Sequence, residues 1–225
     1  MAHATGIGRL AGLAVGLGIG AALAANAGTA SADEFDFQIS IDGYDLIPAA
    51  DTSATATSGT GDFAIAIGDG ASATANDGSF DAAFADGTDS VALTGGGNFD
   101  FASAVGDGSG AGSGDSNGDI AMANGTDSAA FAGGDSVTDV VTTNYPGNND
   151  FAYALGPNTE AIAGGYFGVE TDSNNDTALV IDPFGTAGST ASAGTGDNDF
   201  AAAFGDMLHA MAVAGNDLFT ILPSL

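Results

Sequence analysis

The chain has 225 residues, of which 29 are acidic and only one is Lys or Arg, giving a formal net charge of −28 at pH 7. It has no cysteine, which excludes a disulfide scaffold and thiolate chemistry. Nucleic acid is excluded as a partner on electrostatic grounds, because binding phosphates requires cationic side chains. Cations and basic surfaces are the partners that this charge favours.

The N-terminal residues predict an export signal. Arg9, the one basic residue, precedes the apolar run LAGLAVGLGIGAALAA (10–25) and the small-residue site Ala30-Ser31-Ala32. This layout is typical of a secretory signal peptide, so we expect a signal helix over residues 1–32 that is removed on export. A membrane-spanning helix is the alternative, but the run is shorter than the roughly 20 residues that a span requires. We therefore expect a secreted or cell-envelope surface protein with no permanent membrane span after cleavage.

Residues 33–60 predict a capping strand followed by a linker. FDFQISID (35–42) alternates strictly between apolar and polar residues, which predicts a half-buried strand that caps one end of the fold. The Ser/Thr/Ala-rich stretch 50–60 is typical of a linker. At the other end of the chain, NDLFTILPSL (216–225) is an apolar tail that either caps the fold or stays exposed.

The region between these ends, residues 61–215, consists of imperfect repeats. Units such as GDFAIAIGDGASATA (61–75) join a short apolar run, an Asp-Gly corner and a second run of small residues. Aligned on the bulky residue before each corner, seven units follow one another at uneven intervals. The aligned residues are Ile67, Phe84, Val105, Met122, Leu155, Ile181 and Phe204. The pattern predicts an all-β fold, a repetitive β-solenoid or β-roll of about seven strand–turn–strand rungs.

Alternation also divides each expected strand into two faces. In FAIAI (63–67), the bulky Phe63, Ile65 and Ile67 share one face, while Ala64 and Ala66 share the other. We expect the bulky residues to fill a narrow core, and the alanine face to pack against a neighbouring sheet or chain.

Aspartate recurs at two places in the repeats, which predicts two ladders of stacked carboxylates. The first set precedes the first strand of a unit and comprises Asp62, Asp100, Asp119, Asp150 and Asp199. The second set lies at the corners and comprises Asp69, Asp86, Asp107, Asp182 and Asp206. Like charges at the spacing of neighbouring strands repel one another, so we expect the ladders to need cations, protons or splayed side chains.

Two segments, DSNGD (115–119) and DSNND (172–176), have a D-x-N-x-D spacing that suits calcium, a hard cation that takes several oxygen ligands. Neither continues into an EF-hand loop. The candidate metal ligands are Asp115, Asn117, Asp119, Asp172, Asn174 and Asp176.

No set of catalytic residues is evident. His209 is the one histidine after the expected signal peptide, and neither a G-x-S-x-G elbow nor a P-loop lysine is present. We therefore expect a protein that is not an enzyme and that has no cofactor besides the calcium considered above.

The stretch DFAIAIGDGASATA (62–75) resembles the head repeats of trimeric autotransporter adhesins, which implies the rung geometry of a left-handed β-roll. The layout from the Ala/Gly-rich signal to the Gly/Ala/Asp-rich repeats also resembles exported mycobacterial repeat proteins, loosely akin to the PGRS proteins. The leading hypothesis is a secreted or surface structural and interaction protein, adhesin-like, that contacts the envelope, a host surface or copies of itself. The alternative is an extracellular calcium-binding protein whose Asp-rich turns bind cations and drive folding.

Overall fold

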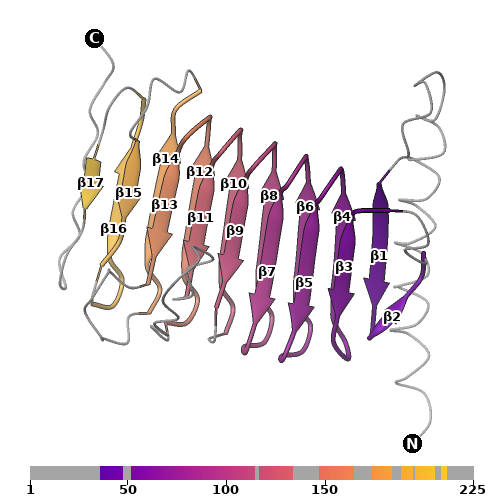
Figure 1. The fold of residues 1–225 in the computed structure, drawn as a ribbon. Coiled ribbons are helices and arrows are strands. Elements are labelled where there is room, and N and C mark those ends of the chain that lie inside the picture. Colours follow the sequence, from indigo (N-terminus) through magenta and orange to yellow (C-terminus); the bar gives the residue numbers. More distant parts are fainter. Residues whose placement is uncertain are drawn as a thin grey trace, which may run out of the picture. The chain divides into compact units, whose positions relative to one another are not determined.

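The described residues of the computed structural model form two β-sheets (Figure 1). They comprise residues 36–47, 52–114, 117–133, 147–164, 174–183, 189–194, 196–205 and 209–211. No helix occurs within these ranges, and the expected all-β class is confirmed for them. The expected signal peptide (1–32) and the apolar tail (216–225) lie outside the described residues.

The first sheet has nine strands and the second has eight. In chain order the first contains β1 (Phe37–Ile41), β2 (Tyr44–Asp45), β4 (Phe63–Ile67), β6 (Ala82–Asp86), β8 (Phe101–Val105), β10 (Ile120–Asn124), β12 (Phe151–Leu155), β14 (Thr177–Ile181) and β16 (Phe200–Ala203). The second contains β3 (Thr55–Ser58), β5 (Ser72–Asn76), β7 (Val91–Gly95), β9 (Gly110–Ser113), β11 (Ala129–Ala132), β13 (Glu160–Ala163), β15 (Thr190–Ser192) and β17 (His209–Met211).

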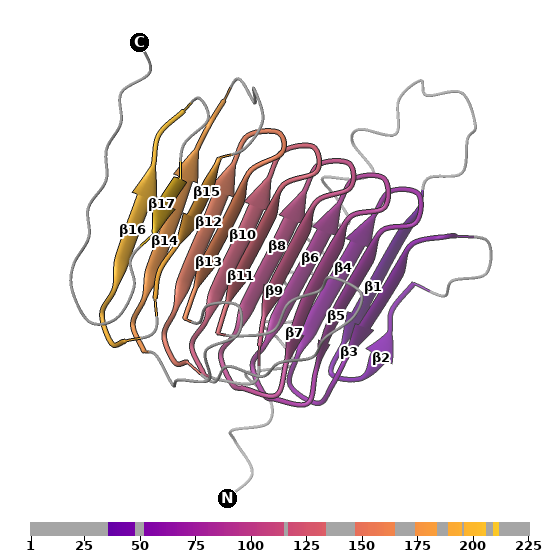
Figure 2. The same ribbon diagram turned by 60° about the vertical axis from the view of Figure 1, so that its left-hand side comes forward.

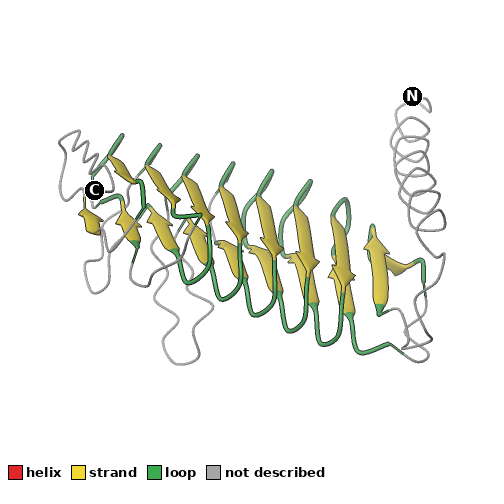
Figure 3. Cartoon of the chain, turned by 90° about the horizontal axis from the view of Figure 1, so that it is seen from above, coloured by secondary structure: helices red, strands yellow, loops and turns green. Residues whose placement is uncertain are grey.

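From β3 onward the chain alternates between the two sheets, and from β5 onward each new strand pairs in parallel with the one before it in its own sheet. Figure 3 shows the result as two rows of strands with loops passing from one row to the other. We call a strand of the first sheet and the second-sheet strand that follows it a rung. The described residues form seven rungs, β4–β5 through β16–β17, as expected from the repeats.

The pairing is in register along the whole stack, but the period differs from the one expected. Ile67 pairs with Asp86 and not with Phe84, whose neighbours are Ile65 and Ser103. The alignment on bulky residues is therefore wrong at Phe84 and at Met122, each of which lies two residues before the position, Asp86 or Asn124, that pairs with Ile67 or Val105. Equivalent positions in the first rungs lie 19 residues apart, and later intervals are 31, 26 and 23 residues.

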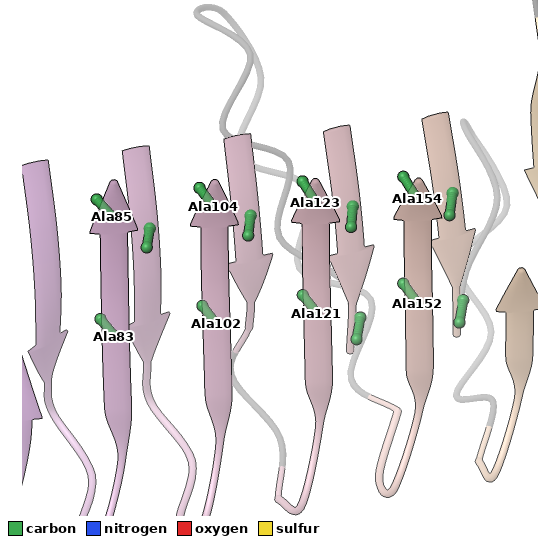
Figure 4. Packing of buried hydrophobic residues seen from close by; sticks show 14 of the residues in the cluster. Ala83, Ala85, Ala102, Ala104, Ala121, Ala123, Ala152 and Ala154 are labelled. Carbon is green, nitrogen blue, oxygen red and sulfur yellow. The ribbon is translucent and has the colours of Figure 1, made fainter. Parts of the chain in front are cut away.

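Alanine lines the interior between the two sheets. Ala83 and Ala85 of β6, and their equivalents on the neighbouring strands, lie in rows that face the second sheet (Figure 4). Val180 is the one bulkier side chain in this buried cluster of alanines. The expectation of a core of bulky residues is wrong. Turns as short as residues 68–71 hold the two sheets close together, so small side chains occupy the space between them.

The bulky residues of the first sheet lie on its outward face instead. Phe63, Phe84, Met122 and Tyr153 alternate with the buried alanines and are half-buried, while Phe101 is 36% exposed. In Figure 2 the strands of this sheet lie side by side from β1 to β16, so that equivalent outward residues follow one another along the stack. The outward face therefore carries rows of aromatic and aliphatic side chains, interrupted by polar residues at Asp86, Ser103 and Asn124.

At the turn from the first sheet to the second, a glycine row allows close approach of neighbouring rungs. Gly106 has a φ of +121°, and a Cβ placed on it would lie 2.6 Å from the carbonyl oxygen of Gly125. A side chain at this position would collide with the backbone of the next rung.

Strand β1 lies near the first end of the stack, between β4 and β2, and falls within the segment 35–42 for which a strand is expected. It pairs antiparallel with β4, unlike every later neighbour in this sheet. Its polar face points inward: the Gln38 Oε1 accepts the backbone N–H of Ala56, and the Ser40 and Ser58 hydroxyls are 2.9 Å apart. Gln38 and Ser40 are thus buried together with Phe37 and Ile39, whereas the half-buried pattern predicted that only one face is covered. Part of the expected linker, Thr55–Ser58, forms β3.

Candidate functional site: aspartate and asparagine ladders

Seven aspartates occupy the same position in successive rungs, at the turn from the second sheet to the first. Each directly precedes a first-sheet strand and is at most 1% exposed. We call this set the aspartate ladder: Asp62, Asp81, Asp100, Asp119, Asp150, Asp176 and Asp199. The first of the two expected carboxylate rows therefore exists, but it lies inside the fold and has two further members, Asp81 and Asp176.

Each carboxyl group of the aspartate ladder except that of Asp199 accepts a hydrogen bond from the backbone of the next rung. The N–H of Asp100 donates to the Oδ1 of Asp81 at 3.0 Å, and the N–H of Asp119 donates to the Oδ1 of Asp100 at 3.0 Å. The same bond recurs along the stack, with donor–acceptor distances between 2.7 and 3.1 Å. The side chains thus replace the main-chain acceptor that an ordinary parallel ladder would supply at this turn, and they tie successive rungs together.

The second carboxyl oxygen is less well satisfied. The Oδ2 atoms of Asp62, Asp81, Asp100 and Asp150 are buried and have no hydrogen-bond partner. A buried carboxylate with an unpartnered oxygen is destabilising, and no Lys or Arg lies within the described ranges to compensate its charge. The arrangement therefore favours a neutral, protonated carboxyl group or a bound cation.

The pKa values follow from this burial. Burial raises the pKa of Asp100 to about 7 and that of Asp150 to about 8. Neighbouring charges of the aspartate ladder add to both shifts, whereas backbone N–H donors oppose them. Burial raises the pKa of Asp81 as well. Part of the aspartate ladder is therefore protonated near neutral pH.

In the middle rungs an asparagine ladder runs two residues before the aspartate ladder, from Asn98 to Asn174. The side-chain amide of Asn98 donates to Asn117 at 2.9 Å, that of Asn117 donates to Asn148 at 3.0 Å, and that of Asn148 donates to Asn174 at 2.9 Å. The amide of Asn174 in turn donates to Asp197 at 2.9 Å. Stacked amides of this kind satisfy one another along the repeat, as they do in other in-register parallel stacks.

The expected calcium ligands divide between these two ladders. Asn117 and Asn174 belong to the asparagine ladder, and Asp119 and Asp176 to the aspartate ladder. The remaining two candidates, Asp115 and Asp172, lie outside the described residues. Among the side chains that the structure describes, no three of His, Cys, Asp or Glu are grouped so that they could hold a metal ion.

The second expected carboxylate row does not form. Asp86 lies within β6 between Ile67 and Val105, and Thr88 separates Asp69 from Asp107 along the stack. Asp182 is buried and accepts a hydrogen bond from the Ser189 hydroxyl, and Asp206 lies outside the described residues. This corner instead carries buried hydroxyls that donate to the carbonyl three residues earlier, those of Ser90, Ser109, Ser128 and Thr159.

A signal for the missed ladder members was present in the sequence. Asp62, Asp81, Asp100 and Asp119 follow one another at a constant interval of 19 residues, whereas the bulky residues do not. An alignment on aspartate would therefore have found Asp81 and the correct register.

Comparison with known proteins gives no relative: no family model, no curated protein and no solved structure matches the chain. The resemblances to autotransporter head repeats and to exported mycobacterial proteins therefore stay predictions. None of the described residues belongs to a helix long and apolar enough to cross a membrane.

Proposed function

We propose that the two sheets are the walls of a β-solenoid, and that the protein is an exported, non-enzymatic structural and interaction protein of the cell surface or its surroundings. One observation carries the proposal: the interior is filled by alanine, while the larger apolar side chains of the first sheet face outward in rows.

The outward rows are the surface that we assign to contact. Leu155 and Ile181 are neighbours in one row, and Tyr153 and Leu179 in the next. Extended apolar surface rimmed by polar residues is typical of a contact with another macromolecule. The partners that we consider are the cell envelope, a host surface and a second copy of the chain.

Substitutions that the stack already tolerates can test this role. Leu155 shares its row with Asn124, and Tyr153 shares its row through Met122 with Ser103. We expect the double variant L155N/Y153S to fold like the wild type but to be retained less on isolated envelopes of the producing cell. Circular dichroism and a urea titration check the fold, and cosedimentation with envelopes measures retention.

A variant on the second sheet provides the control. Thr74 also faces outward, so T74A should leave envelope retention unchanged. Equal retention of L155N/Y153S and the wild type would contradict the proposal, as would absence of the protein from both envelope and medium.

The alternative function is extracellular calcium binding. It is favoured by the buried, unpartnered carboxyl oxygens of the aspartate ladder and by the lack of any Lys or Arg among the residues that the structure describes. Circular dichroism with calcium added and then chelated separates the two. A β spectrum in both conditions supports the structural role, whereas a spectrum that turns β with calcium alone supports the alternative, in which metal binding is linked to folding.

A further inference from the structure

Two phenylalanines at one corner of the stack are both exposed and held in an unfavourable backbone conformation. Phe80 is 68% exposed with a φ of +66°, and Phe99 is 66% exposed with a φ of +64°. Each directly precedes a member of the aspartate ladder. The equivalent residues of the other rungs are the ones that tolerate this conformation: Gly61, Gly118, Asn149, Asn175 and Asn198.

Neither backbone preference nor burial explains a phenylalanine at this position. A bulky residue with positive φ is an outlier, and such strain is concentrated at functional sites. The two rings stack on each other, with centroids 5.2 Å apart and planes inclined by 8°. One face of each ring is thereby covered, and the opposite faces point along the row toward the neighbouring rungs.

The row position beside Phe80 carries no side chain. The residue there is Gly61, where an added Cβ would meet no atom closer than the backbone nitrogen of Phe80 at 3.8 Å. Beyond the glycine lies the exposed Asp42, whose Oδ1 accepts the N–H of Gly61 at 2.8 Å. On the far side of the pair the corresponding space is occupied, because the Asn149 Oδ1 lies 2.7 Å from where a Cβ of Gly118 would be. The free ring face of Phe80, the Gly61 backbone and the Asp42 carboxylate together form what we call the Gly61 slot.

We propose that the Gly61 slot binds the guanidinium group of an arginine on a basic partner protein or peptide. A planar group in the Gly61 slot would extend the pair of stacked phenylalanine rings by one layer, at the spacing of neighbouring strands, about 4.8 Å. Guanidinium stacks on aromatic faces and donates to carboxylates from the same plane, whereas an ammonium group is a point charge without a stacking surface. The net charge of −28 makes a cationic partner the complementary one.

This inference goes beyond the function proposed above. It concerns a corner of the stack and does not depend on what the outward face of the first sheet contacts.

The test compares two short peptides of equal charge on the full chain. Acetylated, amidated Gly-Arg-Gly-Arg-Gly and Gly-Lys-Gly-Lys-Gly are titrated by isothermal calorimetry at about 0.15 M salt, where diffuse attraction is screened. We expect the wild type to prefer the arginine peptide by about two- to fivefold, the range for an exposed cation–π contact. The variant F80N should lose this preference and keep its fold, because Asn149 and Asn175 hold asparagine in the same conformation.

A matched pair of charge variants isolates the carboxylate. D42N removes the charge at the Gly61 slot, and D107N removes one at the opposite corner, where Asp107 likewise accepts a single backbone N–H, that of Thr88. We expect D42N to weaken binding of the arginine peptide more than D107N does.

Three results would overturn the proposal: equal binding of both peptides by the wild type, an arginine preference that survives in F80N, or equal effects of D42N and D107N. Sedimentation of wild type and F80N/F99N supplies a further check. A wild-type dimer that dissociates in the double variant would assign the phenylalanine pair to self-association and contradict the proposal.

Discussion

Asp100 shows how a single side chain serves both register and electrostatics. Its Oδ1 accepts the N–H of Asp119, while its own N–H donates to Asp81, so the residue links three rungs. Its Oδ2 is buried without a partner, and its pKa is raised to about 7 mainly because burial disfavours the charged form. The same position thus stabilises the stack through one oxygen and destabilises it through the other when ionised.

The pH dependence of stability follows from these pKa values. The pKa values of Asp100 and Asp150 in the folded protein, about 7 and about 8, lie above the ordinary value of 3.8, so folding is accompanied by proton uptake between these limits. We expect the free energy of unfolding to rise as the pH is lowered from about 8.5 to about 5. Urea unfolding midpoints, measured across this pH range in the presence of a calcium chelator, check the expected rise. A midpoint that falls on acidification would contradict it, and bound calcium would produce that opposite sign.

Two substitutions at Asp100 separate its two roles. D100N keeps an acceptor for the N–H of Asp119 but cannot ionise, so its urea midpoint should change less with pH than that of the wild type. D100A removes the acceptor and leaves a buried N–H unpaired, which we expect to cost about 1–3 kcal/mol even at pH 5. Equal stability of the two variants at pH 5 would show that the bond does not matter.

At the scale of the strand, alternation predicted the elements but not which face is inside. A period of two defines two faces equally well whichever of them is buried. The buried one is decided by the space between the sheets, which depends on turns such as residues 68–71 and on the contact of both alanine faces. The sequence therefore predicted stacked strand–turn–strand units, their approximate number and a strand within 35–42, but it assigned Phe63 and Ile67 to the wrong side.

Prediction of the candidate site was limited in a similar way. The D-x-N-x-D spacing brought Asn117 and Asp119 together as ligands of one ion, because three oxygens on one turn can converge. In the stack, each residue bonds along its own ladder to the neighbouring rung, and these partners lie 31 residues away in sequence. Such long-range register cannot be derived from the spacing within one turn.

Adjacent residues of β10 test the assignment of faces. Ala123 faces the buried interior and Met122 faces outward. We expect A123L to destabilise the protein by about 1–3 kcal/mol, as overpacking does in other cores, and M122L to change stability by less than about 1.5 kcal/mol. Urea unfolding measures both. A larger loss for M122L than for A123L would mean that the faces are reversed.

Gly106 at the turn from the first sheet to the second, and Gly110 at the start of β9, form a pair of glycines that can be compared. A Cβ at Gly106 would collide with Gly125, and its φ of +121° disfavours any L side chain, whereas a Cβ at Gly110 meets no atom within 4 Å. We expect G106A to cost on the order of 1–3 kcal/mol, and G110A to be neutral or stabilising by up to about 1 kcal/mol. Thermal unfolding of the two variants decides the matter, since similar values would refute a close approach at this turn.

In the stack as a whole, the uniform register means that one rung can take the place of another beside the same neighbour. From β4 to β10, equivalent positions recur every 19 residues, and each rung contacts the next through the same alanine, aspartate and glycine rows. Repeat proteins of this kind derive their stability from such nearest-neighbour contacts.

Deletion of one period tests this at the same scale. Removing residues 84–102 joins Ala83 to Ser103, keeps Ala104 on the inward face and should give a folded protein that is one rung shorter. Removing one residue more, 84–103, turns Val105 inward and should prevent cooperative folding. Circular dichroism and urea unfolding compare the two deletions. If both fold equally well, the register does not control the structure.

The constant interval of the first rungs also has a genetic consequence. Any recombination or slippage event that adds or removes one whole period there leaves the reading frame, the interior and both ladders intact. A single mutational event can therefore add or remove one rung, without a compensating change elsewhere in the chain. Gene variants that differ in length in this region are then expected to differ by multiples of one period.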